Sequence, residues 1–111
     1  MRLTDLEAEF IKRTREGDHD IYRVVDSIDQ ADGISFLCPL CFKANGGSVG
    51  THGVICWRPR VPLTVTPGPG RWEFHGTSLG DLTLVAGSSS VQLTQGCRAH
   101  FFVRAGIVVP A

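Results

Sequence analysis

The residues with the clearest capacity for chemistry are four cysteines and the histidines near them. Cys38 and Cys41 form a C-x2-C pair, and Cys97 and His100 form a C-x2-H pair much further along the chain. Two such pairs supply the thiolate and imidazole ligands that a tetrahedral zinc ion prefers, because each tight turn presents two side chains to one side of the metal. We therefore expect Cys38, Cys41, Cys97 and His100 to bind Zn²⁺.

A second set of ligands competes with this one. His52 and Cys56 form an H-x3-C pair shortly after the C-x2-C pair, so Cys38, Cys41, His52 and Cys56 would make a compact site that is local in sequence. A mixed set that includes Cys56, and a chain without metal, are further alternatives. Taken alone, Cys56 lies in an apolar stretch, which is typical of a small buried hydrophobic residue.

The number of protein ligands separates a structural zinc from a catalytic one. Four protein ligands close the coordination sphere, whereas a catalytic zinc keeps one position for water, so we expect a structural zinc. An enzyme would need an unused histidine near the metal, and His52 and His75 are the candidates. The signatures H-E-x-x-H and H-x-E are absent from the sequence. A thioredoxin-type site is also disfavoured, because the residues after Cys41 run into Gly46-Gly47 and do not favour a helix. We assign no catalytic residue.

The N-terminal segment carries the pattern of an amphipathic helix. Leu3, Leu6 and Phe10 recur at spacings of three and four residues, which predicts a helix over residues 3–15. Thr4 and Glu7 fit a capping box, and Gly17 would end the helix. A helix this short is marginal alone, so we expect it to dock through its apolar stripe on the body or on a second subunit.

The sequence pattern of the rest of the chain predicts short strands separated by glycine, serine and proline. The expected strands are residues 21–25, 34–37, 51–57, 71–75, 81–85, 91–94, 101–104 and 107–109. Residues 26–31 favour one helical turn, and the proline-rich stretch 58–70 favours a loop. The fold class is therefore mainly β: a small antiparallel β-sandwich or open barrel with an N-terminal α-helix, stabilised by zinc. The 111 residues suit a single domain, with the helix at 1–17 and a zinc-binding body at 34–109.

The charge distribution bears on partners. The formal net charge is zero, which disfavours a general nucleic-acid binder. Residues 1–32 nevertheless hold five basic and nine acidic residues, and the remainder holds six basic and two acidic ones, so these two segments carry −4 and +4. These opposite charges favour either a contact within the molecule or an acidic protein partner. Without a long apolar run or a signal-like N-terminus, we expect a cytoplasmic protein with no membrane contact.

Arginine stands beside tryptophan twice, in Trp57-Arg58 and Arg71-Trp72. Such pairs are able to stack on a nucleobase, which keeps a nucleic-acid-binding zinc domain as an alternative. They are equally able to be packed tryptophans with the arginine chain extending outward.

Several short strings resemble a known family of proteins. They are Phe36-Leu37-Cys38-Pro39, Gly50-Thr51-His52, Val54-Ile55-Cys56-Trp57, Pro69-Gly70-Arg71-Trp72, Gly80-Asp81-Leu82-Thr83-Leu84 and Cys97-x-x-His100-Phe101-Phe102. Together they resemble a family of small phage and prophage proteins of unknown function, whose members are often labelled ammonia monooxygenases. The resemblance covers about residues 34–109 and implies a zinc-binding β domain with Cys38, Cys41, Cys97 and His100 as ligands. The oxygenase label has no support in the sequence, which holds no copper-type histidine cluster.

These observations predict a phage-type accessory protein of the host cytoplasm. It would carry a structural zinc and act by contact with another protein, or by self-association, rather than by catalysis. A small zinc-dependent enzyme of hydrolase type and a nucleic-acid-binding zinc domain are the alternatives.

Overall fold

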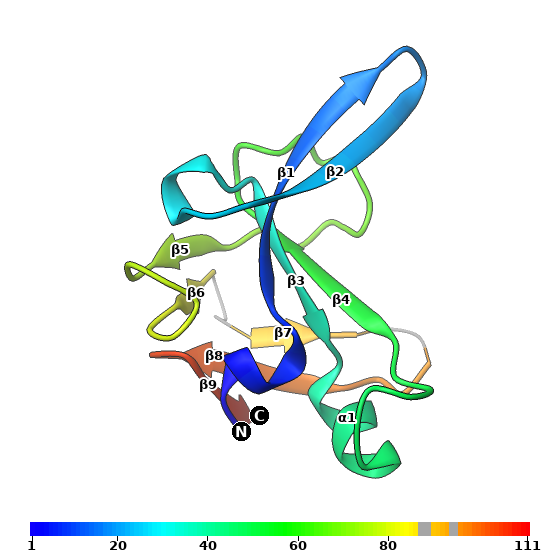
Figure 1. The fold of residues 1–111 in the computed structure, drawn as a ribbon, viewed down its shortest axis with the longest axis vertical. Helices are drawn as coiled ribbons and strands as arrows, with labels where there is room; N and C mark the ends of the chain where they lie inside the picture. The colour runs from blue at the N-terminus through cyan, green and yellow to red at the C-terminus, as the bar shows by residue number, and fades with distance from the viewer. Residues whose placement is uncertain (87–89, 94–95) are drawn as a thin grey trace.

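The computed structural model describes residues 1–86, 90–93 and 96–111, and its described part is built mainly from antiparallel strands (Figure 1). They form a four-stranded sheet of order β2-β1-β3-β4, a two-stranded sheet β5-β6 and a three-stranded sheet β7-β8-β9. One main apolar core draws buried side chains from all three sheets. The predicted mainly β fold class is thus confirmed.

The predicted N-terminal helix is wrong beyond its first turn. A 3-10 turn, η1 (Leu3–Leu6), is followed by a strand, β1 (Glu9–Glu16). Glu7 adopts the left-handed conformation at φ 53°, which ends the turn and redirects the chain. Phe10 packs in the main core and Ile11 in a second cluster, as consecutive residues of a strand do when both faces are covered.

The predicted docking of this segment is nevertheless confirmed. Leu3 and Leu6 are fully buried, and Phe10 is 4% exposed. The start of the chain pairs with its end: the Leu3 amide donates to the Gly106 carbonyl at 2.8 Å, and Figure 1 shows the two termini side by side. The apolar residues that suggested a helical stripe therefore do reach the core, but from two different elements.

The four-stranded sheet carries the elements nearest the candidate site. Strand β1 forms a hairpin with β2 (His19–Val25), which is the edge strand and extends away from the body in Figure 1. The turn η2 (Ile28–Gln30) leads into β3 (Gly33–Leu37), which pairs with both β1 and β4 (Gly53–Trp57). A Cβ at Gly33 would lie 2.6 Å from the Trp57 ring, so only glycine lets Trp57 approach β3 this closely.

The other two sheets complete the body. Strand β5 (Glu73–His75) pairs with β6 (Thr83–Val85), and β8 (His100–Arg104) lies between β7 (Ser90–Gln92) and β9 (Ile107–Pro110). Each of these strands overlaps a segment predicted from the sequence. Residue 94, the last of one predicted strand, lies outside the described residues.

The predicted loop at 58–70 is confirmed. Two buried valines and the hydrogen bonds of one arginine hold it against the body. Val61 and Val65 are buried with Ile11 and Trp57 in the second apolar cluster. The Arg71 guanidinium donates hydrogen bonds to five carbonyl oxygens, all belonging to residues of this loop. A loop without ladder partners is held in this way by one cation and a small core. Among the described residues, no helix is long and apolar enough to cross a membrane.

Candidate metal centre

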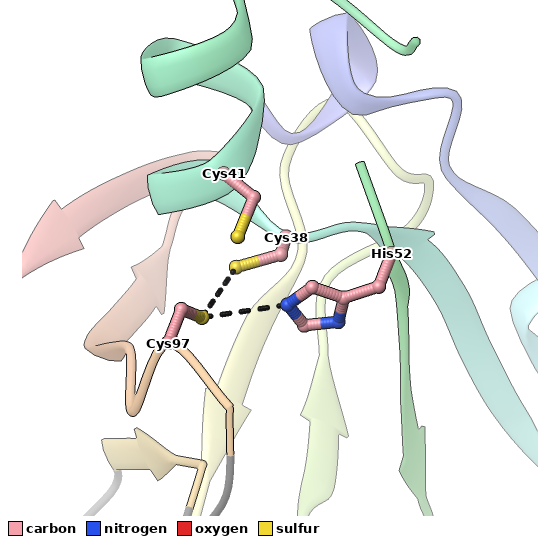
Figure 2. A group of neighbouring side chains, drawn as sticks. All are labelled: Cys38, Cys41, His52 and Cys97. Atoms are coloured by element: carbon pink, nitrogen blue, oxygen red, sulfur yellow. Dashed lines mark hydrogen bonds between the residues drawn. The ribbon is translucent and has the colours of Figure 1, made fainter. Parts of the chain in front are cut away.

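Four side chains with metal-ligand chemistry converge at one end of the four-stranded sheet. The ligand atoms of Cys38, Cys41, His52 and Cys97 all lie within 4.8 Å of one another. Figure 2 shows the three sulfurs and the imidazole pointing toward a common centre. This arrangement has the composition and the size of a site that could hold a metal ion.

A short helix that the sequence analysis missed positions two of the cysteines. Helix α1 (Pro39–Asn45) begins directly after Cys38, with proline at its first position, where proline is favoured. The Phe42 amide donates to the Cys38 carbonyl at 2.9 Å, and Gly46 ends the helix in the left-handed conformation at φ 68°. The expectation that no helix begins at the C-x2-C pair is therefore wrong, because α1 starts directly after Cys38 and its first turn brings Cys41 back beside Cys38.

His52 reaches the centre because the chain returns from α1 alongside β3. The Cys38 amide donates to the His52 carbonyl at 2.9 Å, which places residue 52 opposite residue 38 at the start of β4. The imidazole Nδ1 lies 3.2 Å from the Gly53 carbonyl oxygen, and Nε2 lies 3.4 Å from the Cys97 sulfur. A proton on Nδ1 shared with that carbonyl leaves Nε2 as the free ligand atom, the usual arrangement of a metal-binding histidine.

Cys97 is the member of the group that comes from the C-terminal sheet. It lies in the connection between β7 and β8, where Gly96 at φ 66° and Arg98 at φ 52° both take left-handed conformations. These two residues turn the chain so that the Cys97 side chain faces the end of β3. The centre therefore joins the four-stranded sheet to the three-stranded sheet.

The spacing of the ligand atoms matches zinc coordination. A tetrahedral ion with bonds of about 2.3 Å to sulfur and about 2.0–2.1 Å to nitrogen places two sulfurs about 3.8 Å apart, and a sulfur and a nitrogen about 3.6 Å apart. The Cys38 and Cys97 sulfurs are separated by 3.6 Å, and the His52 nitrogen lies 3.4 Å from the Cys97 sulfur. A disulfide would need about 2.0 Å between sulfurs, and all four cysteines are free.

Hydrogen bonds among the thiols and the imidazole change the pKa values of these groups. The hydrogen bond from His52 lowers the pKa of Cys97 to about 7, and the hydrogen bond with Cys97 raises the pKa of His52. The hydrogen bond with Cys97 is also the main cause that raises the pKa of Cys41 to about 11. A cation at the centre would take the place of these protons, because metal binding deprotonates thiol ligands.

Three of the four ligands predicted from the sequence converge, and the fourth place belongs to a residue of the competing set. Cys38, Cys41 and Cys97 are gathered with His52, and His100 is not a member of this group. His100 is an exposed residue of β8, and its ring centroid lies 6.4 Å from that of Phe102. Cys97 lies in a turn with left-handed backbone at Gly96 and Arg98, whereas His100 begins β8, so the two side chains are not presented on one side as they would be on one turn of a helix.

Cys56 belongs to the core and not to the centre. Its side chain is fully buried within β4 among apolar neighbours, and this burial raises its pKa above the usual range. The interpretation of Cys56 as a small buried hydrophobic residue is confirmed, and the local ligand set that included it is not the one that converges.

The tryptophan–arginine pair Trp57-Arg58 is used within the protein. Trp57 is fully buried, and its Nε1 donates to the Thr66 carbonyl at 3.0 Å. The Arg58 guanidinium donates to the carbonyls of Ile28 and Ala31. Trp57 is therefore a packed tryptophan and offers no face for a nucleobase.

Comparisons of the chain with protein-family models, with curated proteins and with solved structures found no match. The arguments about function consequently rest on the centre itself.

Proposed function

We propose that the chain is a small β module built around a structural zinc ion, and that it acts by contact with another protein rather than by catalysis. The observation that carries this proposal is the complete set of four ligands, three thiols and one imidazole, within 4.8 Å. This donor set suits Zn²⁺ better than the harder cations, which prefer oxygen.

The position of the centre supports a structural role. Cys38, Cys41 and His52 come from one stretch of chain, and Cys97 comes from the connection between β7 and β8. An ion bound to all four ties the end of β3, helix α1 and the start of β4 to the C-terminal sheet. The binding free energy of a structural zinc is comparable with the stability of a whole domain, so such an ion would contribute strongly to folding here.

The accessory role is the second half of the proposal. With all four zinc positions taken by protein atoms, the ion has no place for a substrate or a water, which supports binding over catalysis. The resemblance of the sequence to small phage and prophage proteins supports a role in infected bacteria. Thiolate ligands of this kind persist in a reducing compartment, which supports the host cytoplasm as the site of action.

Metal analysis and spectroscopy test the proposal together. Protein purified without chelator should contain about one zinc per chain, as one complete ligand set requires. The cobalt-substituted protein should show thiolate-to-cobalt charge-transfer bands that do not change when azide is added, because a closed site has no position for an added anion. A zinc-free protein that stays folded would overturn the structural role, and an azide-dependent spectrum would favour the enzyme instead.

A further inference from the structure

A small pocket lies between helix α1 and the hairpin of β8 and β9. It has a volume of about 270 Å³, and Figure 1 shows α1 and the two ends of the chain at the same end of the molecule. Its floor is apolar and buried, and consists of Pro39, Ala99, Phe101 and Val108. The pocket is separate from the metal-ligand group, whose members are Cys38, Cys41, His52 and Cys97 and do not line it.

The register of the hairpin explains the apolar floor. Phe101 lies opposite Pro110, and Val103 lies opposite Val108, so these four side chains share one face of the sheet. That face turns toward the main core, in which Phe101, Val103 and Val108 are buried. At the end that carries Pro110, the same face borders the pocket.

Two large apolar side chains at the border of the pocket are exposed. Leu40 is 51% exposed and Met1 is 44% exposed, and both line the pocket. A ligand with an apolar body would cover these side chains and the floor together, and removal of apolar surface from water is favourable.

The pocket has one cationic side chain on its wall. Lys43 lines the pocket, and it follows Pro39 by four residues and Leu40 by three, so helical spacing places all three on one side of α1. Among the described residues Lys43 forms no salt bridge. Its ammonium group is therefore available to an anionic ligand.

Negative charge is absent from the pocket and from the chain that builds it. No acidic residue lines the pocket. Every lining residue except Met1 belongs to residues 33–72 or 82–111, and neither segment contains an aspartate or a glutamate. An anion at Lys43 would thus meet a cation and no carboxylate of the pocket, which is the charge complementarity that selects a ligand.

We propose that this pocket binds a small, free apolar carboxylate, with its hydrocarbon part on the buried floor and its carboxylate at Lys43. At about 30 Å³ for each non-hydrogen atom, the share of one water molecule in the liquid, the volume holds about nine such atoms. Heptanoate and benzoate have this size. The inference goes beyond the proposed function and does not depend on it, because the pocket and the metal-ligand group share no residue.

Titration of the ¹⁵N-labelled full chain, followed by NMR, tests the inference with three probes of similar size. Heptanoate should shift the amide signals of Leu40, Lys43 and Phe101 with a Kd of about 1 mM, as a ligand this small allows. Heptanamide has the same shape without the charge and should bind about three-fold more weakly. Heptylammonium should bind more weakly still, because Lys43 repels it.

Two pairs of matched variants separate the charge of the pocket from its apolar surface. Lys43→Gln should weaken heptanoate binding about three-fold and remove the difference between heptanoate and heptanamide. Lys12→Gln changes the other lysine, which lies on β1 outside the pocket, and should change the Kd by less than about 1.5-fold. Leu40→Ser should weaken heptanoate and heptanamide alike by about three-fold, whereas Leu63→Ser, at a side chain that is 69% exposed and outside the pocket, should leave both unchanged.

Three outcomes would overturn the inference. They are no shifted signals around the pocket, equal binding of heptanoate and heptanamide, or equal effects of Lys43→Gln and Lys12→Gln. A short peptide that ends in leucine with a free carboxylate tests the other source of the same chemistry, and tighter binding of this peptide than of heptanoate would also overturn it. Heptanoate binding by a protein that holds no zinc would leave this inference standing and overturn the proposed function, and a zinc-loaded protein that ignores heptanoate would do the reverse.

Discussion

Replacing His52 and His100 separately by alanine distinguishes the histidine that the structure places in the metal-ligand group from the one that the sequence pattern favoured. His52 Nε2 lies 3.4 Å from the Cys97 sulfur, within about 0.2 Å of the distance that zinc imposes on such a pair. His100 is exposed on β8 and lies outside the group. His52→Ala should leave a zinc site with three thiolates and a water, whereas His100→Ala should leave the site intact.

The expected magnitude follows from the loss of a direct ligand. Changes to residues that only orient a metal ligand cost about 10–100-fold in metal affinity, so loss of the ligand itself should cost at least about 100-fold. A 100-fold loss corresponds to about 2.7 kcal/mol of metal-linked stability. In a domain of this size each kcal/mol shifts Tm by about 4–8 °C, so His52→Ala should lower Tm by about 10–20 °C. His100→Ala, as a surface change, should stay within about 0.5 kcal/mol, or below about 4 °C.

Competition with a chromophoric chelator measures the zinc affinity, and a thermal melt followed by circular dichroism measures Tm. The cobalt-substituted His52→Ala protein should also gain a response to azide, because its fourth position is then open. A His100→Ala protein that loses zinc while His52→Ala keeps it would refute the geometry argued for this centre.

Three further changes test the rest of the structure. Cys56→Ala should retain one zinc per chain and cost about 1–3 kcal/mol in the free energy of unfolding, because Cys56 is fully buried and lies outside the metal-ligand group. Leu6→Ala should cost about 2–5 kcal/mol in urea denaturation, whereas Val49→Ala, at a side chain that is 88% exposed, should cost less than about 0.5 kcal/mol. The pKa of Asp81 is lowered to about 2, chiefly by a hydrogen bond from the Thr77 hydroxyl, so Asp81→Asn should be less stable than the wild type at pH 7. Because the folded pKa is the lower one, that difference should persist above about pH 4 and vanish as the pH falls toward 2, as denaturation at several pH values would measure.

Strands were easier to predict from the sequence than the N-terminal segment, for a physical reason. The C-terminal strands alternate in burial, as in β8, where the buried Phe101 and Val103 are flanked by the half-buried Phe102 and by the exposed His100 and Arg104. Strand β1 has two covered faces near its start, so Phe10 and Ile11 are both apolar and the period of two is lost. Only the pairing with β2 and β3, which is tertiary information, decides the conformation of that segment.

The ligand set shows the same limit. A C-x2-C pair predicts two adjacent ligands wherever it occurs, because the spacing itself brings them together on one turn, as α1 does for Cys38 and Cys41. Whether His52 or His100 completes the ligand set depends on which strand lies beside the C-x2-C turn. The pairing of β3 with β4 places residue 52 opposite Cys38, and sequence spacing carries no signal for that register.

The use of Cys97 rather than Cys56 has a consequence for stability. A cross-link between distant segments removes more freedom from the unfolded chain than a local one, and the free-energy gain grows by about 0.6 kcal/mol for each doubling of the enclosed loop. The chain between Cys41 and Cys97 is almost four times as long as that between Cys41 and Cys56, so a metal bound through Cys97 would contribute about 1 kcal/mol more than one bound through Cys56. The enclosed segment contains the loop held by Arg71, the sheet β5-β6 and strand β7. These elements are short, and an ion bound at the centre would join both ends of the segment and so add to the stability that their own pairing supplies.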